Sequence, residues 1–252
     1  GFMGGINLAD EYINKRLKHG HWKDTALELH GDAVRSLVYM FLSMWRGITG
    51  VDEVCDEYMP PVDYIAPKSS GFVQPYSDSP IDEELVGEMT YLNMINRAGK
   101  YIYICTPYLI IDNESVTALT LAAKSGVDVR IITPHIGDKW YVHMVTRAYY
   151  PQLIAGGVKI YEYEPGFIHA KTFVSDDQIA TVGTINLDYR SLYLHYECGV
   201  WMYGTSAIGE MKEDFLKTQE KSIPIDMNSP IIKSKGIKKL VCAVLRVFAP
   251  LM

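Results

Sequence analysis

The hydrophobic and polar positions between residues 81 and 163 follow strand and helix patterns in turn. Short apolar runs at 101–107, 127–133 and 158–163 are rich in β-branched and aromatic residues, as buried strands are. Segments 81–98, 114–124 and 141–154 carry apolar residues at helical spacing. Strands that alternate with helices of these lengths predict crossover units. We therefore expect an α/β fold whose mixed, largely parallel sheet has helices on both faces.

The first 71 residues are less regular. We expect a helix at 10–17, a loop at 19–22, and a core helix that starts at the N-cap candidate Asp32 and ends at 47–50. Residues 51–71 contain three prolines and scattered acids, which indicates a boundary between two lobes. We accordingly divide the chain into residues 1–68 and 69–252. Residues 75–80 are predicted to form a turn-rich loop.

One stretch combines residues that suit phosphodiester chemistry. It begins at His169 and Lys171, continues to Asp176, and reaches Asn186 through a Gly-Thr-Ile sequence. Alternation at 168–174, a turn at 176–177 and apolar residues at 178–182 predict a hairpin that brings His169, Lys171 and Asn186 to one mouth. A further strand is expected at 197–203.

The residue types explain what such a mouth could do. A neutral His169 can attack phosphorus and form a covalent intermediate. Lys171 and Asn186 can hold the non-bridging oxygens and stabilise the charge of the transition state. A carboxylate on the other ring nitrogen of the histidine would fix its tautomer.

The pattern His-x-Lys-x4-Asp-x6-Gly-[Ser/Thr]-x-Asn resembles the signature of the phospholipase D superfamily. The resemblance implies that Glu197 is the carboxylate that orients His169. It also includes Asp176 among the catalytic residues, although Asp176 could instead steady the hairpin turn. The sequence Trp22-Lys23-Asp24 resembles a Trp-x-Asp that follows the first motif of that family. Asp24 is therefore either an active-site acid or an ordinary turn or cap residue.

The start of the chain resembles the end of the motif. Gly4-Gly5-Ile6-Asn7-Leu8 matches Gly183-Thr184-Ile185-Asn186-Leu187, so Asn7 is a second candidate phosphate-binding residue. Asn186 lies 17 residues after His169, and the same count back from Asn7 ends before Gly1. We expect the chain to be the C-terminal part of a longer two-copy protein that is cut inside its first motif.

The runs at 106–110, 129–134, 166–173 and 186–191 resemble bacterial cardiolipin synthases of the phospholipase D type. That resemblance implies transfer of a phosphatidyl group between two phosphatidylglycerol molecules through a phosphohistidine, with no cofactor or metal. Those enzymes have two motifs and usually have N-terminal membrane helices, and this chain departs from both features. A phosphodiester hydrolase and an inactive phospholipid-binding fragment remain alternatives. Activity would need the missing N-terminal half or a homodimer, which residues 1–67 would obstruct.

Composition limits the partners. The net charge of −6 argues against a broad basic surface, so no nucleic-acid partner is expected. His19 and His21 have no third ligand nearby, and the cysteines show no zinc spacing. We interpret the four cysteines as buried, reduced thiols of a cytoplasmic compartment. They are Cys55, Cys105, Cys198 and Cys242.

The C-terminal residues 231–252 contain five basic residues, no acid, and apolar residues at helical spacing. Such a helix can lie on an anionic membrane surface, or it can pack on the lobe with its basic face in water. No apolar run of membrane-spanning length is present. With the family resemblance, this predicts a catalytic domain on the cytoplasmic side of the cell membrane.

Overall fold

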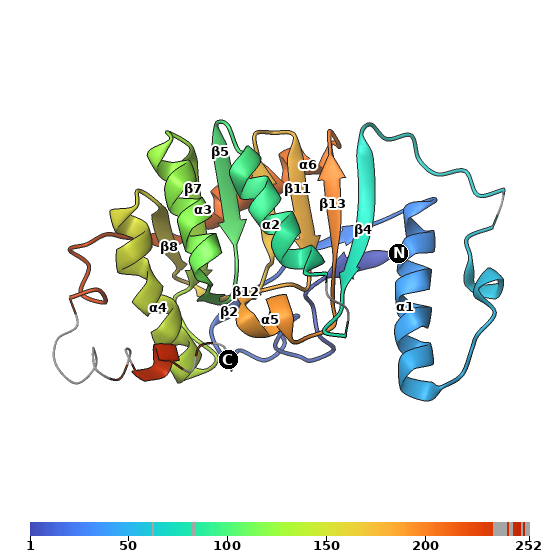
Figure 1. Ribbon diagram of the computed structural model, residues 1–252, viewed down its shortest axis with the longest axis horizontal. Coiled ribbons are helices and arrows are strands. Elements are labelled where there is room, and N and C mark those ends of the chain that lie inside the picture. The colour runs from blue at the N-terminus through green and yellow to red at the C-terminus, as the bar shows by residue number, and fades with distance from the viewer. Residues whose placement is uncertain (62, 82–83, 234–240, 242–243, 248, 250–252) are drawn as a thin grey trace.

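The computed structural model describes residues 1–61, 63–81, 84–233, 241, 244–247 and 249. A sheet of eight strands forms the centre of the molecule (Figure 1). From one edge to the other, its strands are β14 (Ser222–Ile225), β8 (Lys159–Tyr163), β7 (Asp128–Pro134), β5 (Tyr101–Cys105), β10 (Thr172–Ser175), β11 (Ile179–Gly183), β13 (Glu197–Tyr203) and β4 (Phe72–Asp78).

The sheet is mixed, as the sequence predicts, but its parallel part is smaller than expected. Only the neighbours β5, β7 and β8 run parallel, and every other neighbouring pair in this sheet is antiparallel. The parallel strands are joined by helical crossovers, whereas β10 and β11 are joined by the tight turn at Asp176 and Asp177. Tight turns can connect only antiparallel strands.

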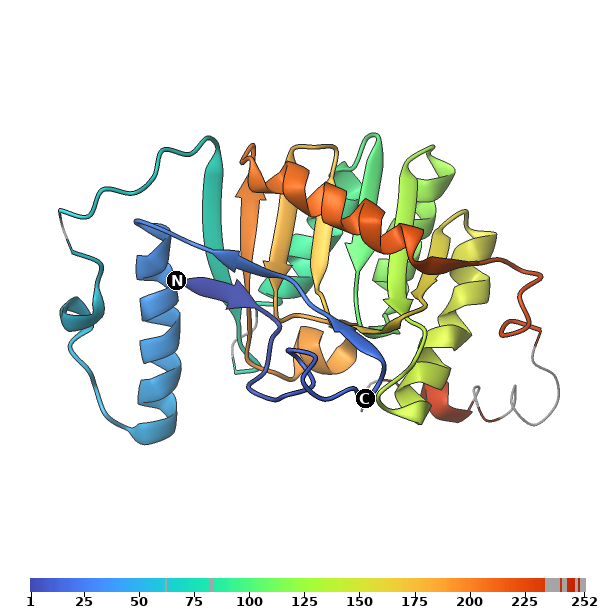
Figure 2. The ribbon, with the colours of Figure 1, turned by 180° about the vertical axis from the view of Figure 1, so that it is seen from behind.

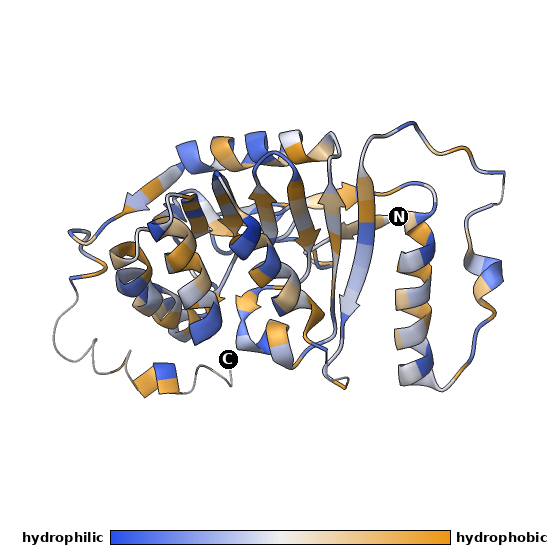
Figure 3. Cartoon of the chain, turned by 45° about the horizontal axis from the view of Figure 1, so that its top comes forward, coloured by the Kyte–Doolittle hydropathy of each residue, from blue (hydrophilic) through white to orange (hydrophobic). Residues whose placement is uncertain are grey.

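Helices cover both faces of the sheet, which confirms the predicted layers. The helices α2 (Val86–Arg97), α3 (Asn113–Lys124) and α4 (Trp140–Ala155) lie on one face, and α6 (Ala207–Glu220) lies on the other (Figures 1 and 2). Strand β5 is buried on both sides. Its Ile102 and Ile104 pack in one hydrophobic core, and Tyr101, Tyr103 and Cys105 pack in the second. In α6, by contrast, hydrophobic and hydrophilic residues alternate along the helix (Figure 3), and its buried apolar residues pack in the second core.

Three two-stranded sheets and the shorter helices complete the described structure. Parallel pairs join β2 (His21–Lys23) to β9 (Gly166–Ile168) and β6 (Leu109–Ile110) to β12 (Leu187–Asp188). An antiparallel pair joins β1 (Phe2–Gly4) to β3 (Ala26–Glu28). The remaining helices are α1 (Ala33–Thr49), the 3-10 helix η1 (Cys55–Tyr58) and α5 (Tyr189–Tyr193).

Three predictions for short segments are wrong. Residues 10–17 form turns instead of a helix, and the side chain of Asn14, at φ 58°, is bonded to both backbone polar groups of Trp22. The expected loop at 19–22 ends in strand β2. The expected loop at 75–80 is mostly strand β4, which tolerates Pro75 because β4 lies at the edge of the sheet.

Helix α1 starts where the sequence predicts, but it is not a core helix. Asp32 precedes it without a side-chain capping bond, and only Leu42 is buried. Phe41, Trp45 and Ile48 are exposed. The helix contacts strand β4 and stands beyond the edge of the main sheet (Figure 1). Its amphipathic spacing therefore indicated a helix correctly but not a buried one.

Two other predictions are settled only in part. Cys105 is buried, but Cys55 and Cys198 are half-buried, and Cys242 lies outside the described residues. Most of the predicted C-terminal helix also lies outside them. Where it is described, Leu245 packs against the main core and the Arg246 guanidinium lies 4.5 Å from the centre of the Tyr149 ring.

The N-terminal elements repeat a part of the main sheet. In one copy β1 pairs with β3 and α1 follows; in the other β11 pairs with β13 and α6 follows. A glycine with positive φ precedes the helix in each copy, Gly31 at 75° and Gly204 at 65°. The similarity between residues 4–8 and 183–187 thus extends into the backbone of the strands and helices that follow.

Candidate active site

The hairpin prediction places the motif correctly, with one change. The predicted strand at 168–174 divides into β9 and β10, and His169, Ala170 and Lys171 lie between them. Strand β9 pairs with β2 in a register that joins Ile168 to Lys23, and the His169 backbone N–H donates to the Lys23 carbonyl at 2.7 Å. His169 directly follows β9, and Asp24 directly follows β2. The pairing of the two strands therefore holds these two residues side by side.

The close approach of these strands depends on a glycine. A Cβ atom on Gly166 would lie 2.4 Å from the His21 backbone nitrogen, so any side chain there would separate β2 from β9. Aromatic rings then enclose the motif histidine. The Trp22 ring centre lies 5.4 Å from that of His169, and Tyr12 meets the imidazole edge-on at 5.1 Å.

Asp24 is the carboxylate partner of His169. Its Oδ2 lies 2.8 Å from His169 Nδ1, and the two side chains are only 3% and 12% exposed. Burial lowers the pKa of His169 below its usual value, although the bond to Asp24 opposes the change. The imidazole is therefore neutral at neutral pH. Because a carboxylate only accepts, Nδ1 carries the proton and Nε2 keeps its lone pair.

Lys171 lies against the same imidazole. Its Nζ is 2.8 Å from each ring nitrogen of His169 and 2.7 Å from the His169 carbonyl oxygen. Burial lowers the pKa of Lys171 to about 8, so the ammonium is mostly charged at neutral pH. A cation beside a neutral nucleophile is suited to receive an anionic phosphodiester.

Glu197 does not orient His169, so that prediction is wrong. Its carboxylate accepts hydrogen bonds from the Thr184 hydroxyl and, at 2.9 Å, from the Ser191 hydroxyl. His195 Nδ1 lies 3.8 Å away. Burial raises the pKa of Glu197. Asn186 joins the same chain of contacts, because its Nδ2 donates to Ser191 at 2.9 Å.

The two acids occupy equivalent positions in the repeat. Asp24 stands two residues before Ala26, which pairs with Gly4. Glu197 stands two residues before Gly199, which pairs with Gly183. Asp24 therefore follows the first Gly-x-x-Asn segment, residues 4–7, but is bonded to His169, which belongs to the motif of the second segment, residues 183–186. This crossing between the copies explains why Glu197, the acid of the second copy, is not bonded to His169.

Asp176 is remote from these groups. It lies in the turn of the hairpin, at the opposite end from Lys171 and Gly183, with φ 56°. Its carboxylate accepts three backbone N–H bonds, from Gly99, Lys100 and Tyr101, at 2.7–2.9 Å. The structure therefore supports the alternative that Asp176 steadies the turn, and its place among the catalytic residues is wrong.

One cavity of about 560 Å³ brings five of the predicted site residues together. Its lining includes His169, Lys171, Asn186, Glu197 and Asn7. The N-terminal segment approaches the motif closely, since a Cβ on Gly5 would lie 2.9 Å from Lys171 Nζ and 3.3 Å from Asp24 Oδ1. Thr184, Ser191 and Tyr12 were not predicted as site residues from the sequence, although Thr184 lies inside the motif itself.

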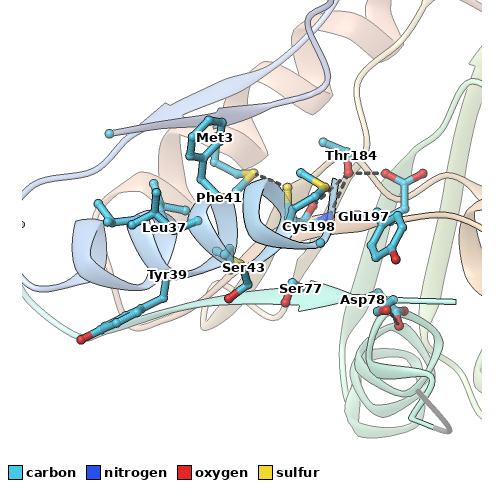
Figure 4. A pocket seen from close by; sticks show the side chains of 18 of the residues that line it. Met3, Leu37, Tyr39, Phe41, Ser43, Ser77, Asp78, Thr184, Glu197 and Cys198 are labelled. Carbon is cyan, nitrogen blue, oxygen red and sulfur yellow. Dashed lines mark hydrogen bonds between the residues drawn. The ribbon is translucent and has the colours of Figure 1, made fainter. Parts of the chain in front are cut away.

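A larger cavity of about 1080 Å³ adjoins this one (Figure 4). The two share Gly4, Thr184 and Glu197. The rest of the larger cavity is lined mainly by α1, including Leu37 and Phe41, by β1 and by the end of β4. Glu197 thus stands between an apolar space and the polar cavity that contains His169.

Comparison with known proteins identifies the family of this chain. Residues 91–218, just over half of the chain, match the family model described as "Cardiolipin synthase, PLD-like domain". The chain belongs to the cardiolipin-synthase-like branch of the phospholipase D superfamily. This membership covers strands β5 to β13 and so includes the motif hairpin and Glu197.

Relatives extend the similarity to the N-terminal residues. An uncharacterized protein of Streptococcus mutans is 48% identical over 251 residues, which is all of this chain and 54% of that protein. The cardiolipin synthase of Geobacillus thermodenitrificans is 40% identical over 226 residues, or 90% of this chain and 45% of that protein. The chain therefore spans about half the length of the curated relatives it matches.

Solved structures share the fold. Phosphatidylserine synthase of Haemophilus influenzae aligns over 99% of this chain and 66% of its own, with a TM-score of 0.69 and 14% identity. The phospholipase D family member Nuc of Salmonella typhimurium covers 62% of this chain, with a TM-score of 0.53 and 17% identity. Among the described residues, no helix is long and apolar enough to cross a membrane, and no cluster of His, Cys, Asp and Glu could hold a metal ion.

Proposed function

We propose that this chain supplies the nucleophilic half of a phosphatidyltransferase site that makes cardiolipin from phosphatidylglycerol. The observation that carries the proposal is the pair of His169 and Asp24, in which the carboxylate accepts from Nδ1 of a buried, neutral imidazole and leaves Nε2 unprotonated beside the Lys171 ammonium. The cardiolipin synthases among its relatives support the choice of substrate.

In the first step, Nε2 of His169 attacks the phosphorus of one phosphatidylglycerol. A nitrogen–phosphorus bond forms, and the bond from phosphorus to the glycerol headgroup breaks. Lys171 and Asn186 hold the non-bridging oxygens, while Asp24 stabilises the positive charge that the imidazole gains. The departing glycerol oxygen takes a proton from a general acid on the opposite side of phosphorus.

In the second step, the free hydroxyl of another phosphatidylglycerol gives its proton to that same group and attacks the phosphohistidine. Cardiolipin leaves, and His169 returns to its neutral form. We assign the second acid–base group to a histidine that Glu197 orients, because Glu197 occupies the position in the repeat that Asp24 occupies for His169. A second copy of the motif, from the same protein or from a partner chain, would supply it. A homodimer is the alternative source, and residues 1–67 would obstruct it.

Incubation of the chain with phosphatidylglycerol vesicles tests the proposal, alone and with a separate polypeptide that carries a second His-x-Lys motif. We expect cardiolipin and glycerol in the presence of that polypeptide and none after His169→Asn. Phosphatidic acid in place of cardiolipin would assign the chain to the hydrolases, because water would then be the acceptor. Lipid binding without any turnover in either mixture would favour a phospholipid-binding fragment and contradict the proposal.

A further inference from the structure

Three surface segments surround the mouth of the cavity that contains His169. They are residues 6–18, 136–141 and 194–196, and together they are called the mouth rim below. Each segment contributes to the cavity lining. The residues are Ile6 from the first segment, Lys139 and Tyr141 from the second, and His195 from the third. All three lie at the same edge of the molecule in both ribbon views (Figures 1 and 2).

The mouth rim exposes large apolar side chains from every one of its segments. Leu8 and Leu17 are 107% and 72% exposed, and Trp140 is 68% exposed. Isolated exposed apolar residues are ordinary on protein surfaces, but a group of them around one opening marks an interaction site. The other members are Ile6, Ile13, Ile136, Tyr141, Leu194 and Tyr196.

Local hydrogen bonds hold the longest segment in this arrangement. The Asn14 side chain accepts from the Trp22 backbone N–H at 2.7 Å and donates to its carbonyl at 2.9 Å. Asn7 Nδ2 donates to the Tyr12 hydroxyl at 2.7 Å. Tyr12 and Asn14 are thus bound inward, while Ile13 between them is exposed. A rim that is already ordered loses little conformational entropy when it binds.

The charge of the mouth rim differs from that of the whole chain. Lys15, Arg16, Lys18 and Lys139 are exposed, and among the described residues none of them is in an ion pair. Arg190, also exposed, lines the cavity beside them. The acids of the rim are Asp10, Glu11 and Asp138, and the Asp138 carboxylate accepts from the Tyr108 hydroxyl at 2.6 Å. With four cations and three carboxylates, the mouth rim carries a net charge of +1, in a chain of net charge −6.

We propose that the mouth rim docks on the surface of an anionic phospholipid bilayer. Exposed leucines with interleaved Lys and Arg are the combination that binds such an interface, and Trp and Tyr prefer the level of the headgroups. Docking would bring lipid phosphates to the opening that leads to His169. None of the rim residues belongs to the basic segment 231–252, and the purpose of docking rests on the proposed function.

Binding of the full chain to vesicles tests the proposal. All variants carry His169→Asn, so that turnover plays no part and a failure of the proposed function leaves this measurement intact. The vesicles contain phosphatidylcholine alone or with 30% phosphatidylglycerol, and the dissociation constant is measured by co-sedimentation. The charge variant is Lys15→Gln/Arg16→Gln/Lys18→Gln, and the apolar variant is Leu17→Ser/Trp140→Ser.

Matched controls remove the same groups elsewhere. Lys68→Gln/Lys124→Gln/Lys217→Gln deletes three exposed cations away from the mouth. Ile65→Ser/Phe72→Ser deletes two exposed apolar side chains, of which Phe72 lies at the opposite end of β4 and β13 from Glu197. Circular dichroism checks that each variant is folded.

We expect the charge variant to weaken binding to phosphatidylglycerol vesicles about 100-fold and the apolar variant at least about 10-fold, with little change in the controls. Equal affinity for both kinds of vesicle would overturn the charge argument. Unchanged binding in either mouth variant, or losses of the same size in its control, would overturn the proposed surface.

Discussion

Replacing Asp24 by asparagine should disable His169 without disturbing the fold. The Asp24 Oδ1 atom accepts from the Thr25 backbone N–H at 2.9 Å, and asparagine keeps an oxygen for that bond. Its amide nitrogen then faces His169 Nδ1 in place of the carboxylate. Because both would be donors, the imidazole proton moves to Nε2, and the nucleophilic lone pair is lost.

The magnitude follows from the bond that is removed. Hydrogen bonds to charged groups contribute roughly 1.5–3 kcal/mol, which corresponds to about 10–150-fold in rate. Loss of the reactive tautomer adds to this, so we expect kcat to fall by about 100-fold or more. KM should change little, because Lys171 and Asn186 still meet the phosphate.

The pH profile separates this role from a structural one. Neutral His169 attacks, so the rate rises with pH through its pKa, which lies below the usual value. Asp24 raises that pKa, and its replacement should therefore move the acidic limb to lower pH while the plateau falls. The assay is cardiolipin formation from radiolabelled phosphatidylglycerol between pH 4.5 and 9. Asp32→Asn, at an exposed acid before α1, is the control. An unchanged kcat, or a loss shared by the control, would refute the reasoning.

Three further predictions concern Lys171, Gly5 and Asp176. Lys171→Gln should lower kcat by about 100- to 1000-fold. The unmodified enzyme should lose activity above a pH of about 8, because the Lys171 ammonium deprotonates there, and a pH–rate series would detect this loss. Gly5→Ala should lower kcat by at least about 10-fold with little effect on thermal stability, since its Cβ meets only side-chain atoms, at the end of Lys171 and at Asp24 Oδ1. Gly47→Ala, with nothing within 4 Å, is the control. Asp176→Ala should lower the free energy of unfolding by about 1.5–3 kcal/mol in urea titrations, because three backbone N–H groups lose their acceptor, and should leave kcat of the folded protein unchanged.

The sequence predicted those parts of the fold that depend on local pattern. Short apolar runs identified β5, β7 and β8, and the alternation and turn at 168–177 identified the hairpin beside Lys171. The edge strand β4 was harder to predict. Its Pro75 suggested a loop, because proline is excluded from central strands and the sequence does not show that β4 lies at the edge. Helix α1 shows a related limit, since amphipathic spacing indicates a helix but not what covers its apolar side.

The site itself was predicted in composition but not in pairing. His169, Lys171, Asn186 and Asn7 do line one cavity, as the motif and its partial repeat suggested. The assignment of Glu197 to His169 failed because the acids cross between the two copies of the repeat. That crossing depends on the parallel pairing of β2 with β9, which joins residues about 145 positions apart and leaves no trace in local spacing.

The most direct test of the account is to trap the covalent intermediate. The enzyme is incubated with phosphatidylglycerol in the presence of its second motif, quenched in base, digested, and analysed by mass spectrometry. We predict a phosphatidyl adduct on the peptide that contains His169, with accumulation reduced by Asp24→Asn and abolished by His169→Asn. An adduct on a different histidine, or cardiolipin formation by the His169→Asn variant, would contradict it.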